Sequence, residues 1–249
     1  MAFGAIIIGD EIMRGKREDK HFAKLVGLLG ARGLRLAWAR YLGDDPERLT
    51  STLRETFASG DIVFSFGGIG ATPDDHTRQC AAAALGVPLL LHSEAEALIR
   101  ERFGAETTAQ RLKMGELAQG AAIIPNPFNR IPGFAIREHW FVPGFPVMAW
   151  PMVEWVLDEH YRHLHHRLAE AEDWVIVYDA AESTLTPLME SLEVRFPELK
   201  VFSLPHVGDS SRPRHIELGV RGTPARVPEA MEALQRGVVE CGGRWEPRD

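Results

Sequence analysis

Short apolar runs alternate with amphipathic stretches over the first third of the chain. Residues 5–8 and 61–66 are mainly β-branched or aromatic, which is typical of strands buried on both faces of a sheet. Residues 34–42 form a third candidate strand, and residues 21–29, 46–59 and 78–85 have the spacing or composition of helices. The repeated order of strand and helix, with short connections, predicts a parallel sheet with helices on both faces.

Shorter elements follow as far as a polar stretch at residues 169–173. The polar stretch predicts a domain boundary, so we expect a first domain over residues 1–168. Its remaining expected elements are a strand at 87–92, a helix at 93–103 with Ser93 as N-cap, a weak helix at 107–117, a strand at 121–124, a hairpin-like pair within 132–146, and a helix at 150–168 with Pro151 in its first turn.

A second, smaller domain is expected over residues 173–249. Its pattern gives a strand at 174–178, a helix at 183–194, a strand at 200–204, a polar loop at 207–214, a strand at 215–220 and a helix at 228–241. This β-α-β-β-α order predicts an α+β domain of roughly ferredoxin-like topology.

Composition narrows the class of protein. The chain has 249 residues, 45% of them hydrophobic, with a net charge of −7, which argues against a nucleic-acid partner. No apolar run reaches the length of a membrane span, and the N-terminus looks like a first strand and not a signal peptide. Cys80 and Cys241 suggest neither a disulfide framework nor a thiolate metal site, so we expect a cytoplasmic protein.

The segment Phe66-Gly67-Gly68-Ile69-Gly70-Ala71-Thr72-Pro73-Asp74-Asp75-His76-Thr77 lies between a predicted strand and a predicted helix. Glycines there allow positive φ and let a ligand approach bare backbone N–H groups, and a helix N-terminus favours anions. Gly67, Gly68 and Gly70 are therefore candidate phosphate ligands, with hydroxyl contacts from Thr72 and Thr77. The alternative is a tight turn in which an Asp or Thr caps the helix.

Other strand ends also carry glycine and acids. Gly9-Asp10-Glu11 and Gly43-Asp44-Asp45 follow predicted strands, and the carboxyl ends of parallel strands meet at one edge of the sheet. Asp44 and Asp75 could together hold a divalent cation that bridges to phosphate, because hard cations prefer carboxylate oxygen. Asp74 stands beside Asp75 at the helix mouth, and Asp10 has the alternative role of a helix cap.

Other reactive residue types have simpler explanations. The histidines at 160, 163, 165 and 166 fit a solvated helix end, and no acid or cysteine completes a metal site with them. Cys80 lies among alanines and is expected in the core. The sequence contains neither a P-loop motif nor a Rossmann fingerprint.

The glycine segment resembles the signature of the molybdopterin-binding (MoaB/Mog-type) domain, and is most similar to the branch found in CinA-type competence/damage-inducible proteins and some FAD synthases. Four further segments resemble that branch in the right order: Gly9-Asp10-Glu11-Ile12, Gly43 to Leu49, Pro125-Asn126-Pro127 with Pro132-Gly133-Phe134, and the loop Pro143-Gly144-Phe145-Pro146. The resemblance covers about 150 residues, and the C-terminal part is similar to the small domain that follows in this branch.

The resemblance implies a three-layer α/β/α sandwich with a mostly parallel sheet, and a signature loop that binds a pterin or nucleotide phosphate. It implies catalytic roles for Asp44 and Asp75, ligand contacts from Gly9, Asp10, Glu11, Pro143 and Gly144, a divalent metal (Mg²⁺ or Co²⁺), pyrophosphate cleavage of ADP-ribose or FAD, and self-association. Three positions depart from the branch: Asp19-Lys20-His21 replaces Asp-Thr-Asn, Ala71 stands where proline is common, and Phe145-Pro146-Val147 replaces Pro-Ser-Glu. These departures leave open a module that kept the fold and the ligand but lost the chemistry.

Overall fold

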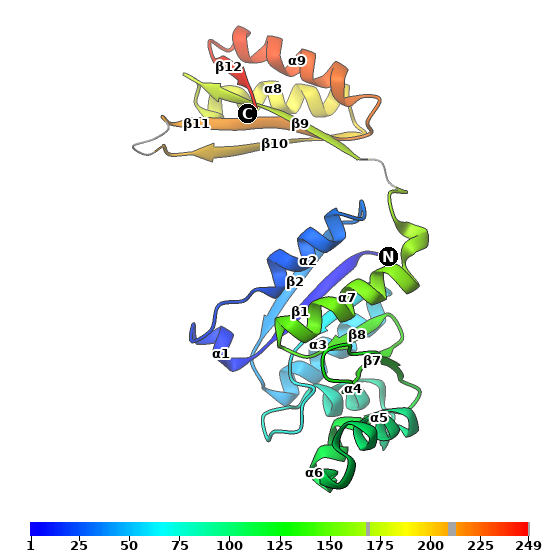
Figure 1. The fold of residues 1–249 in the computed structure, drawn as a ribbon. Coiled ribbons are helices and arrows are strands. Elements are labelled where there is room, and N and C mark those ends of the chain that lie inside the picture. Colours follow the sequence, from blue (N-terminus) through cyan, green and yellow to red (C-terminus); the bar gives the residue numbers. More distant parts are fainter. Residues whose placement is uncertain (168–169, 209–212, 249) are drawn as a thin grey trace. The chain divides into compact units, whose positions relative to one another are not determined.

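The computed structural model describes residues 1–167, 170–208 and 213–248. The chain divides into two compact units, Met1–His165 and His166–Asp249, which are described separately below (Figure 1). The expected boundary at 169–173 and the expected loop at 207–214 fall partly on residues outside these ranges.

The main elements of the first unit follow the predicted alternation of strand and helix. In chain order they are β1 (Phe3–Ile8), α1 (Asp10–Met13), α2 (His21–Gly30), β2 (Leu36–Leu42), α3 (Pro46–Ser59), β3 (Ile62–Phe66), α4 (Thr77–Leu85), β4 (Leu89–Leu91), α5 (Ser93–Phe103), η1 (Gly104–Glu106), α6 (Ala109–Leu112), η2 (Lys113–Gly115), β5 (Glu116–Ala118), β6 (Ala122–Ile124), β7 (Gly133–Ile136), β8 (His139–Val142), α7 (Pro146–His160) and η3 (Arg162–Leu164).

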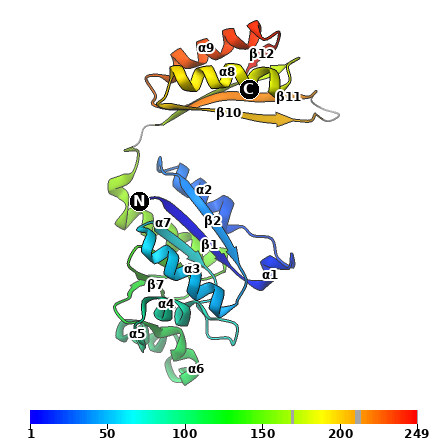
Figure 2. The same cartoon turned by 180° about the vertical axis from the view of Figure 1, so that it is seen from behind.

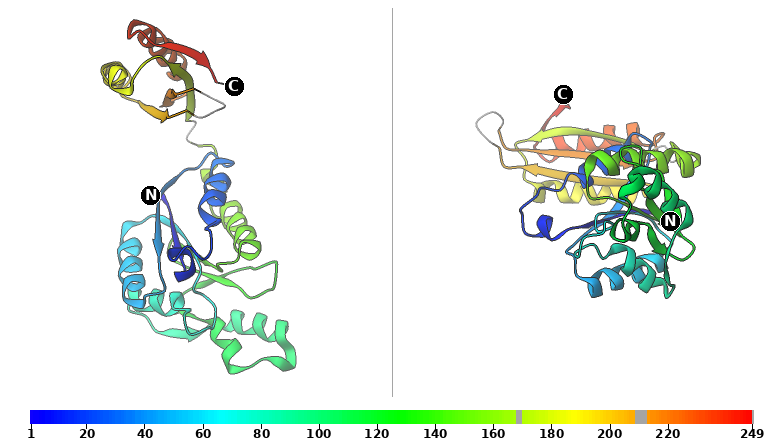
Figure 3. Two further views of the ribbon diagram at one scale, coloured as in Figure 1. Left: turned by 90° about the vertical axis from the view of Figure 1, so that its left-hand side faces the viewer. Right: turned by 60° about the horizontal axis from the view of Figure 1, so that its bottom comes forward.

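The main sheet has the strand order β2-β1-β3-β8-β7-β6. β2, β1, β3 and β8 are parallel, whereas β7 is antiparallel to both β8 and β6. Helices α2 and α7 pack on one face of the sheet, and α3 and α4 pack on the other (Figure 3). Each pair of helices forms a separate hydrophobic cluster with its face of the sheet. The predicted α/β fold with a mostly parallel sheet is confirmed, as is the hairpin within residues 132–146.

Two predicted helix details around β4 and β5 are wrong. Residues 107–117 form the short helix α6, the turn η2 and the strand β5, because Glu116–Ala118 pairs with β4 through the register Leu90↔Leu117. The N-cap of α5 is His92 and not Ser93, since the His92 Nδ1 accepts from the backbone N–H of Ala95 at 3.4 Å.

Helix α7 begins earlier and ends earlier than predicted. Pro146 is its first residue, where the fixed φ of proline suits a helix start, so Pro151 lies inside the helix and not in its first turn. Pro151 cannot donate to the carbonyl of Val147, whose residue is exposed to solvent. The helix ends at His160, and the predicted end at Leu168 lies outside the described residues.

The second unit is a sheet covered on one face by two helices (Figure 2). Its elements are β9 (Ala171–Tyr178), α8 (Glu182–Arg195), β10 (Leu199–His206), β11 (His215–Gly222), α9 (Val227–Glu240) and β12 (Arg244–Pro247). The antiparallel strand order β10-β11-β9-β12 is ferredoxin-like, as predicted. The edge strand β12 was not predicted, because Arg-Trp-Glu-Pro has little apolar patterning.

Within the described residues, the helices are too short or too polar to cross a lipid bilayer.

Candidate functional site

The loop between β3 and α4 is held by its carbonyl groups. The carbonyl oxygens of Gly67 and Gly68 accept from the Thr77 hydroxyl and the Thr77 backbone N–H, each at 3.0 Å. The next two carbonyls, of Ile69 and Gly70, accept from Nε and Nη2 of Arg78 at 3.1 and 2.6 Å. Four successive carbonyls therefore turn towards two residues at the start of α4.

Arg78 is a buried cation, with 2% of its surface exposed. Its Nη1 also donates to the carbonyls of Glu116, at 3.0 Å, and of Lys113. Burial lowers the pKa of Arg78, an effect partly offset by the charges of Glu116 and Asp75. The guanidinium thus joins the glycine loop to the η2–β5 segment, a role that the sequence did not reveal.

The backbone N–H groups of the same loop are left free. Gly68, Ile69 and Gly70 donate to no acceptor among the described residues, whereas the N–H of Gly67 bonds the Val142 carbonyl. Gly68 has φ +68°, and a Cβ there would lie 2.2 Å from the Thr77 hydroxyl oxygen. Because its carbonyls are bonded and three of its N–H groups are not, the loop offers donors without acceptors at a helix N-terminus, which is the chemistry that an anion site requires.

The ends of β1 and β2 are tied together by two aspartates. The Asp44 carboxylate accepts from the backbone N–H of Asp10 at 2.9 Å, and the Asp10 carboxylate accepts from the backbone N–H of Asp44 at 3.2 Å. Gly9 and not Asp10 is the N-cap residue of α1, and its N–H bonds the Leu42 carbonyl at 3.0 Å. Asp45, not Asp44, caps α3 by accepting from the Arg48 N–H at 2.7 Å.

Three of the candidate acids act on a fourth, Asp44. Burial raises the pKa of Asp44, and the negative charges of Asp10, Glu11 and Asp74 raise it further, against a lowering by its bond to the Asp10 backbone. The structure therefore brings together acids from the β1, β2 and β3 loops.

Asp75 is used within its own loop. One of its carboxylate oxygens accepts from the Thr72 N–H at 2.8 Å and from the Thr72 hydroxyl. A pocket of about 400 Å³ adjoins this turn and is lined by Thr72, Asp75 and Gln110, among others. Thr72 and Asp74 are exposed there, while Thr77 is fully buried and holds the loop.

The acids do not form a ready metal site. In the described chain, no three ligating atoms of His, Cys, Asp or Glu residues lie within 4.8 Å of one another at this edge of the sheet. One carboxylate oxygen of Asp44 accepts from the Asp10 backbone N–H, and one of Asp75 accepts from the N–H and hydroxyl of Thr72. The donor set as arranged does not fit a divalent cation held by Asp44 and Asp75.

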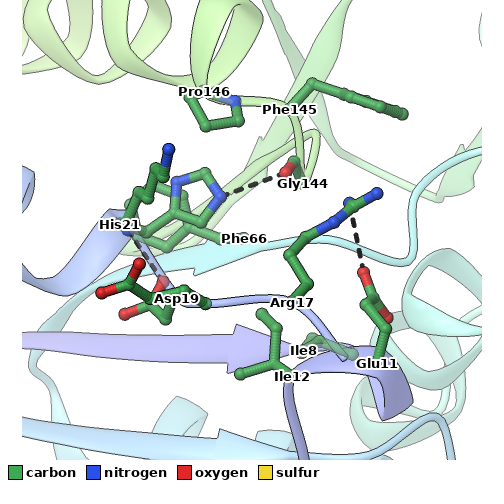
Figure 4. A pocket seen from close by; sticks show the side chains of 12 residues that line it. Ile8, Glu11, Ile12, Arg17, Asp19, His21, Phe66, Gly144, Phe145 and Pro146 are labelled. Atoms are coloured by element: carbon green, nitrogen blue, oxygen red, sulfur yellow. Dashed lines mark hydrogen bonds and ion pairs between the residues drawn. The ribbon is translucent and has the colours of Figure 1, made fainter. Parts of the chain in front are cut away.

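A second pocket, of about 260 Å³, is lined by residues at the carboxyl ends of β1, β3 and β8 (Figure 4). His21 lies in it, stacked on Phe66 at 4.5 Å between ring centroids, with Nε2 3.1 Å from the Gly144 carbonyl. Burial lowers the pKa of His21, so the neutral ring donates from Nε2 and carries a lone pair on Nδ1. Nδ1 is buried and has no partner among the described residues.

Sequence patterns missed His21 as a site residue, although the departure Asp19-Lys20-His21 was visible. The Asp19 carboxylate accepts from the N–H groups of His21 and Phe22 and from the Tyr41 hydroxyl, which fixes the start of α2. Glu11 lines the same pocket and pairs with Arg17 at 3.4 Å.

The loop before α7 approaches the glycine loop. A Cβ on Gly144 would lie 3.4 Å from the Gly67 Cα, so these two backbones lie close together. Pro143 is half-buried beside it, and Phe145, which follows, is 55% exposed at the pocket rim. The β8–α7 loop therefore lies beside the glycine loop and completes the pocket.

Comparison with known proteins identifies the fold family. The family model for the "Probable molybdopterin binding domain" matches residues 4–163. A CinA-like protein of Anaeromyxobacter sp. (strain Fw109-5) is 32% identical over 253 residues, covering 93% of this chain and 62% of that protein. A CinA-like protein of Anaeromyxobacter sp. (strain K) is 33% identical over 238 residues, covering 86% of this chain and 57% of that protein.

A solved structure agrees with this. The crystal structure of the protein CinA, of unknown function, from Thermoplasma acidophilum is 26% identical, with a TM-score of 0.59, and covers 64% of this chain and 98% of that one. The chain spans about three fifths of the length of the two Anaeromyxobacter relatives named above. From the match over residues 4–163, the chain belongs to the molybdopterin-binding (MoaB/Mog-type) domain family and is CinA-like.

Proposed function

We propose that the first unit binds the phosphate group of a phosphorylated pterin or nucleotide at the glycine loop. The observation that carries this proposal is the set of free N–H groups on Gly68, Ile69 and Gly70, next to carbonyls that are all bonded elsewhere. Such an array offers donors without acceptors, as an anion requires.

The acids nearby restrict how that anion is bound. Asp10, Glu11, Asp44 and Asp74 would repel a bare phosphate, so binding should be stronger when a cation or a proton reduces their charge. Because the pKa of Asp44 is raised, its carboxylate takes up a proton at a higher pH than an ordinary aspartate does.

The rest of the ligand can use the pockets that adjoin the loop. One pocket reaches Phe66 at the start of the loop, and the other reaches Ala71 and Thr72 at its end. The neutral His21 offers Nδ1 as an acceptor for an N–H or O–H group of the ligand, such as those on a pterin ring or a ribose.

A second candidate function is cleavage of a dinucleotide pyrophosphate of the ADP-ribose or FAD type. The acids beside the phosphate cradle favour it, since such reactions commonly use carboxylates with Mg²⁺ or Co²⁺. Because Asp44 and Asp75 are not arranged around a metal position, we assign no metal-dependent step to them. Binding without cleavage is the alternative outcome.

The test is a thermal-shift screen of the full chain with inorganic phosphate, molybdopterin-related compounds, ADP-ribose and FAD, each with and without Mg²⁺ or Co²⁺. A ligand at about 100 times its Kd adds roughly 2.7 kcal/mol of stability. A shift with any phosphorylated ligand supports the binding proposal, and the absence of a shift with all of them contradicts it.

Product analysis then separates the two functions. Release of monophosphates that is lost in Asp44→Ala and Asp75→Asn supports cleavage by these acids. Turnover that persists unchanged in both variants excludes their catalytic role, and binding with no product identifies a ligand-binding module.

A further inference from the structure

The second unit carries a cluster of metal-ligating side chains that is separate from the glycine loop. His206 at the end of β10 lies directly opposite His215 at the start of β11 in the antiparallel register. Glu217 follows two residues later on β11, so it lies on the same face of the sheet as His215. That face is opposite the one that packs Ile216, Leu218 and the helices α8 and α9.

The three side chains are close enough to share one ion. One ligand atom from each of His206, His215 and Glu217 lies within 4.8 Å of the other two. The His206 Nε2 is 3.3 Å from a Glu217 carboxylate oxygen. Metal–ligand bonds of about 2.0–2.1 Å in a tetrahedral site separate two ligand atoms by roughly 3.3–3.4 Å, so this pair already has the required spacing.

A hydrogen bond holds His215 in the tautomer that ligation through Nε2 needs. Its Nδ1 lies 2.8 Å from the Pro213 carbonyl, which can only accept, so Nδ1 carries the proton and Nε2 carries the lone pair. A second hydrogen bond of this kind fixes the tautomer of histidine ligands in metal sites. His215 is 5% exposed and stacks on His206 with 4.6 Å between ring centroids, whereas His206 itself is exposed.

We propose that His206, His215 and Glu217 bind a first-row transition metal ion of the Zn²⁺ class. A proton on His206 would satisfy Glu217 but would leave the lone pair of His215 Nε2 without a partner in the described chain. A divalent cation satisfies all three ligands together. Two imidazoles and one carboxylate suit Zn²⁺, Co²⁺ or Ni²⁺, and three protein ligands leave at least one coordination position for water or an external donor.

The test is a Zn²⁺ titration of the tag-free full chain, with competition by a chromophoric chelator, followed by substitution with Co²⁺ to read the coordination from its visible spectrum. We expect one tight site per chain with a tetrahedral Co²⁺ spectrum. His206→Gln and Glu217→Gln each remove one ligand from exposed or half-buried positions and should weaken Zn²⁺ binding at least tenfold without loss of folding, as checked by circular dichroism.

The matched control is the double variant His163→Gln, His166→Gln, which removes two histidines of the segment that follows α7. It should leave the tight site unchanged. The proposal is overturned if the chain binds no Zn²⁺, if binding survives His206→Gln and Glu217→Gln, or if the control removes it, which would place adventitious binding at the end of α7.

The His206→Gln variant also distinguishes this site from the glycine loop. Any Co²⁺-dependent pyrophosphate cleavage should be measured again in His206→Gln. Cleavage that persists in His206→Gln belongs to the first unit. Loss of Zn²⁺ binding in the same variant concerns only the site on β10 and β11.

Discussion

Replacing Gly68 by alanine tests the geometry of the phosphate cradle, and Gly86 provides a matched control. Gly68 has φ +68° and Gly86, the C-cap of α4, has φ +67°, so alanine meets the same backbone penalty at both sites. The left-handed conformation costs a non-glycine residue about 1–2 kcal/mol. The surroundings differ: an added Cβ lies 2.2 Å from the Thr77 hydroxyl oxygen at Gly68 and meets nothing within 4 Å at Gly86.

The clash at Gly68 has a further consequence. Thr77 is fully buried and its hydroxyl bonds the Gly67 carbonyl, so moving it leaves that carbonyl unsatisfied, at a cost of about 1–3 kcal/mol. We expect Gly86→Ala to destabilise the protein by about 1 kcal/mol and Gly68→Ala by about 3 kcal/mol. For a domain of this size these values correspond to roughly 3 °C and 9 °C in Tm.

Urea unfolding of the two variants measures the difference, and a Thr77→Ala background isolates its cause. Adding Gly68→Ala to Thr77→Ala should cost only the backbone term, about 1 kcal/mol, because the clashing oxygen is gone. Phosphate-ligand binding should be lost in Gly68→Ala and kept in Gly86→Ala. Equal destabilisation by Gly68→Ala and Gly86→Ala, or full additivity with Thr77→Ala, would refute the geometry described for this loop.

Three further predictions concern single side chains. His21→Phe keeps the stack on Phe66 but removes both ring nitrogens, so we expect about tenfold weaker ligand binding from the loss of Nδ1 and a lower Tm from the loss of the Nε2 bond to the Gly144 carbonyl. Unchanged affinity by calorimetry would exclude a ligand contact through Nδ1. Asp44→Asn should raise the Tm at neutral pH, because the pKa of Asp44 is raised in the folded protein and its ionisation therefore opposes folding. The gain in Tm should vanish below about pH 3.8, where Asp44 is protonated in both states, and a lower Tm at neutral pH would contradict the prediction. Burial lowers the pKa of His139 to about 3, so the stability that neutral His139 contributes is complete above about pH 6.5 and is lost as the pH falls towards 3, by at most roughly 5 kcal/mol. In His139→Phe the free energy of unfolding should therefore depend less on pH in that window, and an unaltered pH profile would show that another group dominates.

Local patterns were enough to predict most of the fold. The strands β1 and β3 are apolar at almost every position, and the glycine loop and the loops after β1 and β2 contain residues that favour turns. The convergence of Asp10 and Asp44 follows from parallel strands alone, so it could be inferred before any coordinates were known.

What could not be predicted depends on partners distant in sequence. In the sequence, Arg78 has the position of an exposed residue in the first turn of a helix. No neighbouring residue indicates that its side chain donates to the carbonyls of Lys113 and Glu116. The burial of His21 depends on Phe66 and Gly144, and the strand β5 exists only because β4 pairs with it. For β12, a single half-buried tryptophan in Arg244–Pro247 gives no period to detect.

The burial of Arg78 has a consequence for how the glycine loop responds to a ligand. If the loop changed shape, the charged guanidinium of Arg78 would lose the carbonyls that accept from it. Water could take the place of these carbonyls only if the η2–β5 segment also opened. Its conformational entropy is therefore lost when the chain folds and not when an anion arrives. An anion should therefore bind this preorganised loop with little loss of backbone entropy. We expect fast association even though the ligand makes few contacts with the loop.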